Sequence, residues 1–417
     1  MSVPNIAETN ALEFVKRERD GLIDFAARLI ATPSPNPGGS ELAAAEVAEE
    51  QMHVLGMQKT RIVGRSRERA NLIYEFDTGT PGPTLLLNGH LDTKPPDPID
   101  AWETDPYEGV VIDGKLHGLG AADMKGPDAA LVYGMAAVVN ASTDNLTGKV
   151  LLILSADEEG EATYGPRYLV EELGIQADVA LIAEPAGVTQ NWETLPLISR
   201  GISIIRFIVK GTQTHSSISD RVPVVNASLE ASRLLAYLVE NLKLNCPVTP
   251  LCPGGPTINL GTEFHAGEGL AKISGKAEFM GDVRTLPGMS QQQFAEDVDR
   301  AVDAFRRENP GVELAWEFME GILDWTQPTE ISADDPLVGV LQRAAEKVLG
   351  AAPPLGYFPG GTDAIWWQGA AGIPTIPGFG PGLLPNCHKP NEYVEVEALI
   401  QAAKIYALTI LDYLGEA

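Results

Sequence analysis

The stretch Thr84-Leu-Leu-Leu-Asn-Gly-His-Leu-Asp-Thr93 joins an apolar run to a histidine and an aspartate two residues apart. The apolar run predicts a buried strand, with His90 and Asp92 following at its end. Because residues two apart in an extended chain face the same side, Asp92 can accept one imidazole proton while the other nitrogen of His90 binds a metal ion. The spacing alone is weak evidence, since a single histidine after a strand is more often a structural or surface residue.

The segments around this stretch alternate between strands and helices. Val150–Leu154 and Asp178–Ala183 are apolar runs without alternation, which is typical of strands covered on both faces. Two more strands are expected at Ala70–Phe76 and Thr84–Asn88. Strands separated by helices indicate an α/β fold with a mainly parallel sheet that carries helices on both faces.

Helical periodicity marks the rest of this larger domain. Apolar side chains at helical spacing predict one N-terminal helix over residues 11–31, which ends before a proline-rich loop. A second helix is expected over residues 41–55, with Ser40 as a possible cap. Two further helices are expected over residues 121–139 and 394–414.

The central third of the chain has a different texture, in which strands and helices follow in the order β-α-β-β-α-β. This order suits a small two-layer α+β domain of the ferredoxin-like type. We therefore expect residues 200–318 to be inserted between the two parts of the larger domain, residues 1–199 and 319–417. The expected inserted elements are strands over residues 202–210, 257–261, 271–284 and 312–317, and helices over residues 222–242 and 290–307.

The composition limits the classes of partner. The 417 residues include 30 Lys and Arg against 57 Asp and Glu, and the formal charge of −27 disfavours nucleic acid and anionic membranes. The N-terminus lacks a basic start and an apolar core, and no apolar run approaches the roughly 20 residues of a membrane helix. A cytoplasmic location is expected. Cys246, Cys252 and Cys387 lack CxxC spacing and are expected to be free, buried thiols.

Other acidic residues and one histidine lie just beyond predicted strands or at a helix start. They are Asp157-Glu158-Glu159, Glu184, His388 and Asp123. Taken singly, each has an ordinary explanation: a solvated turn, a strand end, a loop histidine, or an acid favoured by the helix dipole. Ligands of open α/β sheets gather outside the carboxyl ends of the strands, so these residues are expected to share one site. A pair of divalent metal ions would compensate such buried charges.

A larger set of motifs runs through nearly the whole chain. It consists of Gly89-His90-Leu91-Asp92-Thr93, Trp102 with Asp105-Pro106-Tyr107, the segment from Gly114 to Gly126, Asp157-Glu158-Glu159-Gly160, Ala183-Glu184-Pro185, Gly211 with His215-Ser216, Asp282-Val283-Arg284, Gly360-Gly361-Thr362-Asp363, and His388 with Asn391-Glu392. In this order the motifs resemble the M20 metallopeptidase family, which includes acetylornithine deacetylase, succinyl-diaminopimelate desuccinylase and glutamate carboxypeptidase. The combination is specific, although no single motif is.

The resemblance implies a site for two divalent metal ions. It implies that Asp123 bridges two zinc ions, one also held by His90 and Glu184, and the other by Glu159 and His388. Two imidazoles with several carboxylates suit zinc, but cobalt and manganese accept the same donors.

The resemblance also implies the reaction. Glu158 matches the family's general base, and Asp92 would orient His90. In this chemistry two metal ions roughly 3.5–4 Å apart activate a bridging hydroxide and polarise a carbonyl, while the base passes the proton of water to the leaving amine. The expected reaction is hydrolysis of the amide C–N bond of a small N-acyl amino acid or a short peptide.

Roles in the inserted domain follow from the same resemblance, which implies a lid and dimerisation domain in a homodimer. His215 matches a histidine that reaches the partner subunit's site and stabilises the oxyanion. Arg284 matches an arginine that binds a substrate carboxylate, for which a guanidinium is geometrically suited. Asn259, Gly361 and Thr362 match further substrate-contact positions. A polar-loop histidine and a strand-end surface charge are the ordinary alternatives for the first two.

Several departures from the family pattern leave the substrate open. They are Lys94, His117, Leu119 and Ile365. A second interpretation is therefore hydrolysis of a non-peptide C–N bond in a carbamoyl or aromatic amine compound. Trp366 and Trp367 are expected in the core, although one could wall a bulky acyl pocket. A noncatalytic metal- or ligand-binding module is a third interpretation, which the presence of Glu158 disfavours.

Overall fold

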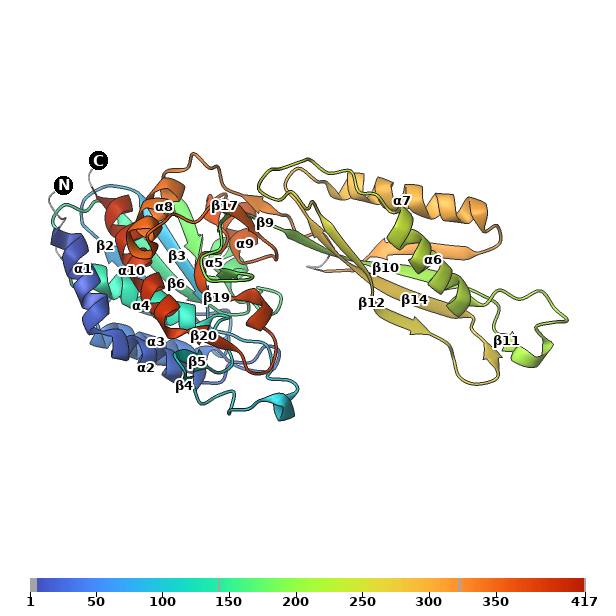
Figure 1. The fold of residues 1–417 in the computed structure, drawn as a ribbon, viewed down its shortest axis with the longest axis horizontal. Helices are drawn as coiled ribbons and strands as arrows, with labels where there is room; N and C mark the ends of the chain where they lie inside the picture. Colours follow the sequence, from blue (N-terminus) through green and yellow to red (C-terminus); the bar gives the residue numbers. More distant parts are fainter. Residues whose placement is uncertain (1–5, 142, 322–323, 416–417) are drawn as a thin grey trace. The chain divides into compact units, whose positions relative to one another are not determined.

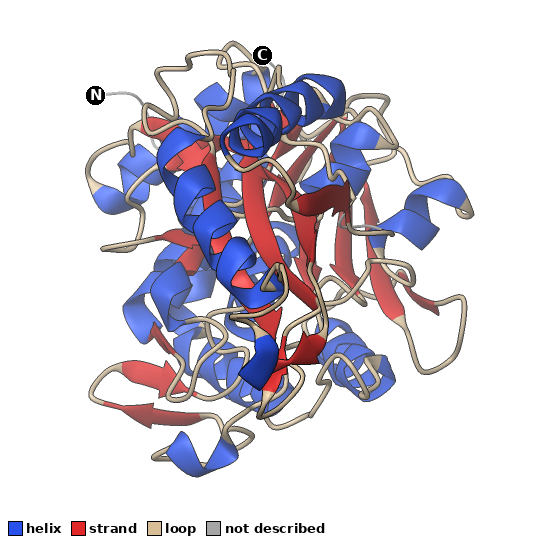
Figure 2. Ribbon diagram, turned by 90° about the vertical axis from the view of Figure 1, so that its right-hand side faces the viewer, coloured by secondary structure: helices blue, strands red, loops and turns tan. Residues whose placement is uncertain are grey.

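The structure, a computed structural model, describes residues 6–141, 143–321 and 324–415. They form two compact units, whose helices and strands are distinguished by colour in Figure 2. Unit 1 consists of the described residues within Met1–Ile198, Glu330–Phe358 and Thr362–Ala417, and unit 2 consists of those within Ser199–Thr329 and Pro359–Gly361.

Unit 1 is built around a sheet with the strand order β1-β2-β6-β3-β7-β18 (Figure 1). Strands β6, β3, β7 and β18 are parallel to one another, whereas β2 is antiparallel to β6 and β1 is antiparallel to β2. The prediction of a mainly parallel sheet is confirmed. The strands are β1 (Thr60–Val63), β2 (Asn71–Asp77), β3 (Thr84–His90), β6 (Lys149–Ser155), β7 (Val179–Ile182) and β18 (Thr375–Ile376).

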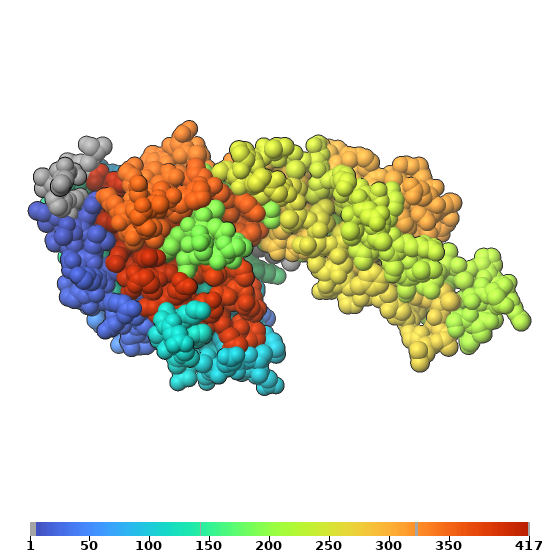
Figure 3. Space-filling model, viewed as in Figure 1, coloured from blue at the N-terminus to red at the C-terminus, as the bar shows by residue number. Residues whose placement is uncertain are grey.

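Helices cover both faces of this sheet. On one face α4 packs on β3 and β6 and against α10, and α4 is buried along nearly its whole circumference. On the other face α5 and α9 share an apolar cluster with the strands. Figure 3 shows the N-terminal segment (blue) beside the C-terminal segment (red), where α1 packs against α10. The helices are α1 (Ile6–Arg17), α2 (Arg19–Ile30), α3 (Leu42–Val54), α4 (Lys125–Val139), α5 (Pro166–Glu171), α8 (Pro336–Leu349), α9 (Ala364–Gly369) and α10 (Val396–Leu414).

Short strands and single turns connect these elements. Three small sheets have the strand orders β20-β5-β4, β19-β8 and β16-β9-β17. Their strands are β4 (Val110–Ile112), β5 (Lys115–His117), β8 (Pro185–Gly187), β9 (Leu195–Ser199), β16 (Thr329–Glu330), β17 (Leu355–Phe358), β19 (Gly380–Leu383) and β20 (Tyr393–Glu395). The 3₁₀ turns of unit 1 are η1 (Ile99–Ala101) and η3 (Leu384–Asn386), and η2 (Ser216–Ile218) lies in unit 2.

Unit 2 contains an antiparallel sheet with the strand order β12-β14-β10-β15, against which α6 and α7 pack (Figure 1). Residues along β10 alternate between buried and half-buried, as expected for a strand with one face on a core. The predicted order β-α-β-β-α-β is confirmed. The elements are β10 (Gly201–Lys210), α6 (Ala227–Asn241), β12 (Thr257–Ala266), β14 (Lys276–Thr285), α7 (Gln291–Glu308) and β15 (Glu313–Phe318), with a separate pair, β11 (Thr214–His215) and β13 (Lys272–Ile273).

Two predicted helices differ in the structure. The single N-terminal helix is wrong, because the chain breaks at Glu18 into α1, which packs on α10 and α4, and α2, which packs on α4 and α3. The second error is the start of α6, which begins at Ala227 and not at Val222. Asn226 caps α6, and its Oδ1 accepts a hydrogen bond from the N–H of Ser228 at 3.1 Å.

The structure also bears on two expectations drawn from composition. Among the described residues, no helix is both long and apolar enough to cross a membrane. The three cysteines are free, as predicted, but only Cys252 is buried, whereas Cys246 and Cys387 are partly exposed.

Candidate metal centre

Strand ends place the central side chains of a polar cluster in unit 1. β3 ends at His90, and its neighbours β6 and β7 run parallel to it, so the three strands end at one edge of the sheet. The chain continues from β6 into Asp157-Glu158-Glu159 and from β7 into Glu184. A Cβ at Gly89 would lie 1.9 Å from Oδ1 of Asp128 on α4, so only glycine allows this close approach of helix and strand.

Asp123 and His388 come from loops. Asp123 lies just before α4, and Oε1 of Glu392 accepts hydrogen bonds from the N–H groups of Asp123 and Ala122 at 3.0 and 2.7 Å. His388 lies in the segment before β20, and its side chain is 49% exposed. Glu392 therefore fixes the loop that carries the most central carboxylate of the cluster.

The two imidazoles and the carboxylates meet around Asp123. Its Oδ1 lies 3.1 Å from Nε2 of His90, and its Oδ2 lies 3.1 Å from Nε2 of His388. Oε1 of Glu184 lies 3.5 Å from Nε2 of His90, and Oε1 of Glu159 lies 2.9 Å from Nε2 of His388. Asp123 presents one oxygen to each imidazole, which is the arrangement that a carboxylate shared by two cations requires.

These donors fit a pair of divalent metal ions. Ligand atoms of His90, Asp123 and Glu159 lie within 4.8 Å of one another, as do those of His90, Glu158 and Glu184. Imidazole nitrogens and carboxylate oxygens suit zinc, and cobalt and manganese accept the same donors. The second set means that Glu158 has the position of a possible ligand as well as that of a possible base.

The excess of buried carboxylates changes the protonation of the cluster. Burial and the neighbouring Asp123 raise the pKa of Glu184 to about 7, and burial and Glu184 raise the pKa of Glu158 well above its usual value. Hydrogen bonds to Asp123 and Glu159 raise the pKa of His388 to about 10. Bound cations would relieve the repulsion among the carboxylates, because they add positive charge to a cluster in which carboxylates outnumber imidazoles.

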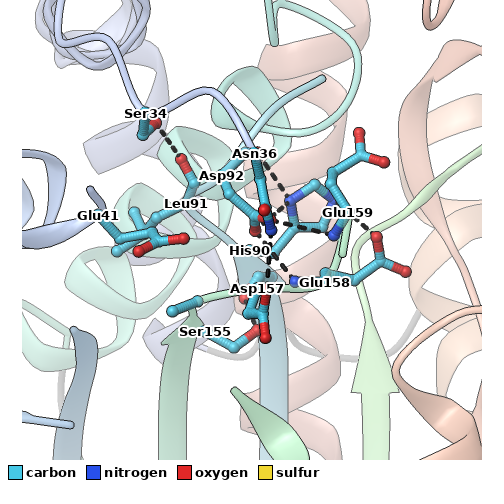
Figure 4. Close-up of polar contacts among 12 residues, drawn as sticks. Ser34, Asn36, Glu41, His90, Leu91, Asp92, Ser155, Asp157, Glu158 and Glu159 are labelled. Carbon is cyan, nitrogen blue, oxygen red and sulfur yellow. Dashed lines mark hydrogen bonds and ion pairs between the residues drawn. The ribbon is translucent and has the colours of Figure 1, made fainter. Parts of the chain in front are cut away.

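Asp92 connects the histidine strand to the loop after β6 (Figure 4). Its Oδ1 accepts a hydrogen bond from the N–H of Glu158 at 3.1 Å, and its Oδ2 accepts one from the N–H of Glu159 at 3.0 Å. Nδ1 of His90 lies 3.0 Å from the main-chain oxygen of Asp92 and 3.5 Å from its Oδ1. Asp92 therefore contacts the imidazole most closely through its backbone and uses its carboxylate on the loop.

The departures from the family pattern occupy different surroundings. Nζ of Lys94 lies 3.2 Å from Oε2 of Glu159 and also donates to its main-chain oxygen, so this cation adjoins the cluster. Leu119 is buried, and the ring of His117 packs against the ring of Tyr393 with 5.5 Å between centroids. Lys94 is the departure that bears on the chemistry of the site.

Three residues of the site were not assigned from the sequence. Asp363 is buried, its Oδ2 accepts a hydrogen bond from Oγ of Ser155 at 2.9 Å, and burial raises its pKa to about 8. Asp363 and Glu392 lie within motifs that resemble the family, and these motifs could have indicated that both residues belong to the site. Asn36 donates to Asp92 across 56 residues, and no local spacing indicates such a contact.

Other predicted site residues belong to unit 2. His215 is exposed, and its Nδ1 accepts a hydrogen bond from the N–H of Ser217 at 3.2 Å. Arg284 donates two hydrogen bonds to Asp282, at 2.7 and 2.9 Å. Asn259 is exposed on β12, opposite Asp282 of β14. The geometry of unit 2 thus joins Arg284 to an acidic neighbour on its own strand.

The segment before α9 contains the remaining predicted residues. Gly361 is half-buried and belongs to unit 2, whereas Thr362 is buried and belongs to unit 1. Trp367 is fully buried, so its predicted core position is confirmed. Trp366 is only half-buried, so the same prediction is wrong for that residue.

The fold and the cluster define a class of protein: an α/β protein with donors for two divalent metal ions and an additional α+β unit. Comparison with known proteins narrows this class. The sequence profile of peptidase family M20/M25/M40 matches residues 86–412. The chain belongs to this family and is a metallo-hydrolase acting on C–N bonds. The family predicted from the motifs is confirmed.

Individual relatives agree with this assignment. The chain is 28% identical over 352 residues to the succinyl-diaminopimelate desuccinylase of Thiobacillus denitrificans, which covers 81% of this chain and 82% of the relative. It is 28% identical over 397 residues to the acetylornithine deacetylase of Photorhabdus laumondii, which covers 93% and 96%. The crystal structure of human carnosine dipeptidase 1 matches the fold with a TM-score of 0.74 at 18% identity, covering 99% of each chain.

Proposed function

We propose that this protein is a dinuclear metal-dependent amidohydrolase that cleaves the amide C–N bond of a small N-acyl amino acid or a short peptide. The observation that carries the proposal is the position of Asp123, whose two carboxylate oxygens each lie 3.1 Å from a different imidazole. The names of the relatives, a deacetylase and a desuccinylase of amino acid derivatives, support the class of substrate.

In this proposal five residues would hold two zinc ions. His90 and Glu184 would hold one ion, Glu159 and His388 would hold the other, and Asp123 would contribute to both, which agrees with the distances within the cluster. When bound, such a pair of cations lowers the pKa of water and polarises a carbonyl oxygen. Main-chain contact with Asp92 sets the orientation of the His90 ring.

Glu158 is the proposed general base. Its Oε2 lies 3.9 Å from Nε2 of His90, and its side chain is 18% exposed, so substrate and water can reach it. Burial raises the pKa of Glu158, which makes its carboxylate a better acceptor for the proton of water, and the protonated group can return this proton to the leaving nitrogen. This proton transfer makes the leaving group a neutral amine.

Unit 2 is proposed to recognise the substrate. Its strand order is that of a ferredoxin-like sandwich, and we assign to it the roles of lid and dimerisation domain in a homodimer. Arg284 would bind a substrate carboxylate in exchange for Asp282, and the partner subunit's His215 would stabilise the oxyanion. Asn259, Gly361 and Thr362 would contact the rest of the substrate.

A substrate panel tests the proposal. Protein freed of metal and reloaded with zinc, cobalt or manganese is assayed for released amine from N-acetyl, N-succinyl and N-carbamoyl amino acids and from dipeptides. We expect turnover of an N-acyl amino acid or dipeptide that a chelator abolishes and added metal restores. Turnover confined to N-carbamoyl compounds would replace the proposed substrate class, and turnover that survives complete chelation would refute the metal-dependent mechanism.

A further inference from the structure

The loop after β6 carries both the proposed base, Glu158, and the proposed ligand, Glu159. It begins with Asp157, whose φ of 66° lies in the left-handed region. Aspartate adopts this conformation more readily than most residues, but a buried instance persists only where neighbouring contacts hold it. The contacts of Asp157 therefore decide where the next two side chains point.

Asp157 is buried and is held by three donors, of which Figure 4 shows Asn36. Its Oδ1 accepts hydrogen bonds from Nδ2 of Asn36 at 2.9 Å and from a guanidinium nitrogen of Arg69 at 3.0 Å. Its Oδ2 accepts one from the N–H of Tyr164 at 3.1 Å. Both carboxylate oxygens are engaged, so the first residue of the loop is fixed through its side chain.

Asn36 joins this carboxylate to a second one. Its Nδ2 also donates to Oδ2 of Asp92 at 2.8 Å, so each amide hydrogen has its own carboxylate partner. Asp92 in turn accepts from the N–H groups of Glu158 and Glu159. The buried amide of Asn36 thus joins the side chains of Asp92 and Asp157. Through Asp92 it is also connected to the backbone of the loop.

Backbone hydrogen bonds fix Asn36 beside the residues that follow β3. The segment Ser34–Asn36 runs along Leu91–Thr93: the N–H of Asn36 donates to the oxygen of Thr93 at 2.7 Å, and the N–H of Thr93 donates to the oxygen of Ser34 at 3.1 Å. Oγ of Ser34 donates to the oxygen of Leu91 at 2.6 Å. The Asn36 side chain therefore has little freedom to follow a displaced loop.

Arg69 supplies the positive charge of the network. One of its guanidinium nitrogens lies 2.6 Å from Oε1 of Glu41 and 3.0 Å from Oδ1 of Asp157, and its side chain is only 15% exposed. The guanidinium also lies over the ring of Tyr164, 5.4 Å from its centroid. Without Arg69 the carboxylates of Asp157, Glu41 and Asp92 would have less compensation, which is costly for buried charges.

Gly160 shows independently how closely this network is packed. A Cβ at this position would lie 2.5 Å from Oδ1 of Asp157 and 2.7 Å from Nδ2 of Asn36. Neither atom can retreat without breaking a buried hydrogen bond. The loop therefore leaves room only for glycine directly behind the contact between Asn36 and Asp157.

We propose that Arg69 and Asn36 are positioning residues, which hold Asp157 and Asp92 and thereby set Glu158 and Glu159 relative to His90. The inference rests on the proposed function for the roles of Glu158 and Glu159. Arg69 and Asn36 themselves contribute neither an imidazole nor a carboxylate to the cluster, and they act on it through Asp157 and Asp92. Loss of either side chain weakens metal binding and slows the chemical step, while binding of substrate stays nearly constant.

Arg69→Gln is the principal test, with Arg65→Gln as its matched control. Arg65 lies four residues earlier in the same connection, has a 37% exposed side chain and pairs with Glu172. Zinc affinity is measured by competition with a chromophoric chelator on metal-depleted protein, and kcat and KM are measured with the best substrate of the panel. In Arg69→Gln we expect the affinity for one of the two zinc ions to fall about 10–100-fold and kcat to fall by a similar factor, with KM changed less than about twofold. Arg65→Gln should match the wild type.

Arg69→Lys keeps the charge but replaces a planar guanidinium by a single ammonium, so it should recover part of the loss. Arg69→Gln protein that is less stable but retains wild-type zinc affinity and kcat would overturn the proposal, because the role would then be structural only. If Arg69→Gln does not fold, Arg69→Lys decides by the same criteria, and wild-type values would again overturn it. A wild-type protein that binds two zinc ions but hydrolyses nothing refutes the proposed function, and zinc affinity alone then tests the positioning role.

Discussion

The cluster of unit 1 and the ion pairs on the surface of unit 2 place charged residues in different surroundings. In unit 1 the carboxylates of Asp123, Glu159 and Glu184 are buried and lie close together, Glu159 and Glu184 beyond the ends of parallel strands and Asp123 just before α4. In unit 2 the ion pair of Lys210 and Glu313 has side chains that are 63% and 70% exposed. Exposed pairs cost little and contribute little, whereas buried like charges are costly and are retained where they serve function. This difference supports the proposal that the metal centre lies in unit 1.

The strands differ in the same sense. Every residue of β6 from Val150 to Ser155 is buried, whereas β10 alternates between buried and half-buried positions. A strand buried on both faces can present polar groups only at its ends, and the carboxylates Glu158 and Glu159 follow the end of β6. A half-exposed strand such as β14 can present Asp282 and Arg284 along its length. Four predictions test this contrast, in order of decreasing expected effect.

The largest effect is expected for Glu158→Gln. Loss of a general base lowers kcat by roughly 10²–10⁴-fold. The number of bound zinc ions should stay at the wild-type value, because the five proposed ligands remain. The measurements are steady-state kinetics and metal analysis. Glu161→Gln, an exposed position in the same loop, is the control. Loss of one zinc ion in Glu158→Gln would show instead that Glu158 is a ligand, as its distance from His90 and Glu184 also permits.

Phe279→Ala should lower the stability of unit 2 without affecting the metal centre of unit 1. Phe279 is fully buried in unit 2, and its ring centroid lies 4.9 Å from that of Phe207. Truncation of such a residue lowers the free energy of unfolding by about 3–5 kcal/mol. Denaturant unfolding should show an earlier transition for unit 2, with zinc affinity unchanged. Phe264→Ala, at a 38% exposed residue, is the milder control. Equal loss of zinc binding would mean that the units are not energetically separate.

Glu41→Gln tests the cost of a buried carboxylate in unit 1. Burial and Asp92 raise the pKa of Glu41 from 4.5 to about 7 in the folded protein. Between these pH values the unfolded chain releases its proton first, so wild-type stability falls as pH rises from 4.5 to 7 and then stays low. The variant should escape this decrease, a difference of about 3 kcal/mol above pH 7.

Chemical denaturation of metal-depleted protein at pH 4.5 and pH 8 measures this difference. Glu46→Gln, at an exposed position on α3, is the control and should follow the wild type at both pH values. Parallel pH profiles for the wild type and Glu41→Gln would contradict the raised pKa of Glu41.

The smallest effect is expected in unit 2. Lys210→Gln removes the exposed ion pair with Glu313, in which Nζ and Oε1 lie 2.5 Å apart. Such pairs contribute about 0.2–1 kcal/mol, and salt screens them. The variant should unfold within about 1 kcal/mol of the wild type, and high salt should remove the difference. A larger, salt-resistant loss would show that exposed charges matter in unit 2 as buried ones do in unit 1.

Local sequence patterns predicted which helices and strands exist better than they predicted where each one begins and ends. Apolar runs predicted β3, β6 and β7, and periodicity predicted α3 and α7, because burial on two faces or on one stripe leaves a direct trace in the sequence. The break at Glu18 left no such trace, since the apolar spacing continues across it. Packing of α1 on α10 and of α2 on α3 decided it, and those partners are distant in sequence.

The amino-acid sequence was enough to predict the kinds of donor: two histidines and several carboxylates, each just past a strand end or at a helix start, in the order of a known family. Only the tertiary structure decided how they meet, with Asp123 between His90 and His388. The network of Asn36, Asp157 and Arg69 was likewise visible only in three dimensions. The pattern that predicts a strand lies within a few consecutive residues, so it can be read from the sequence. The contacts of a buried polar group depend on segments that only folding brings together.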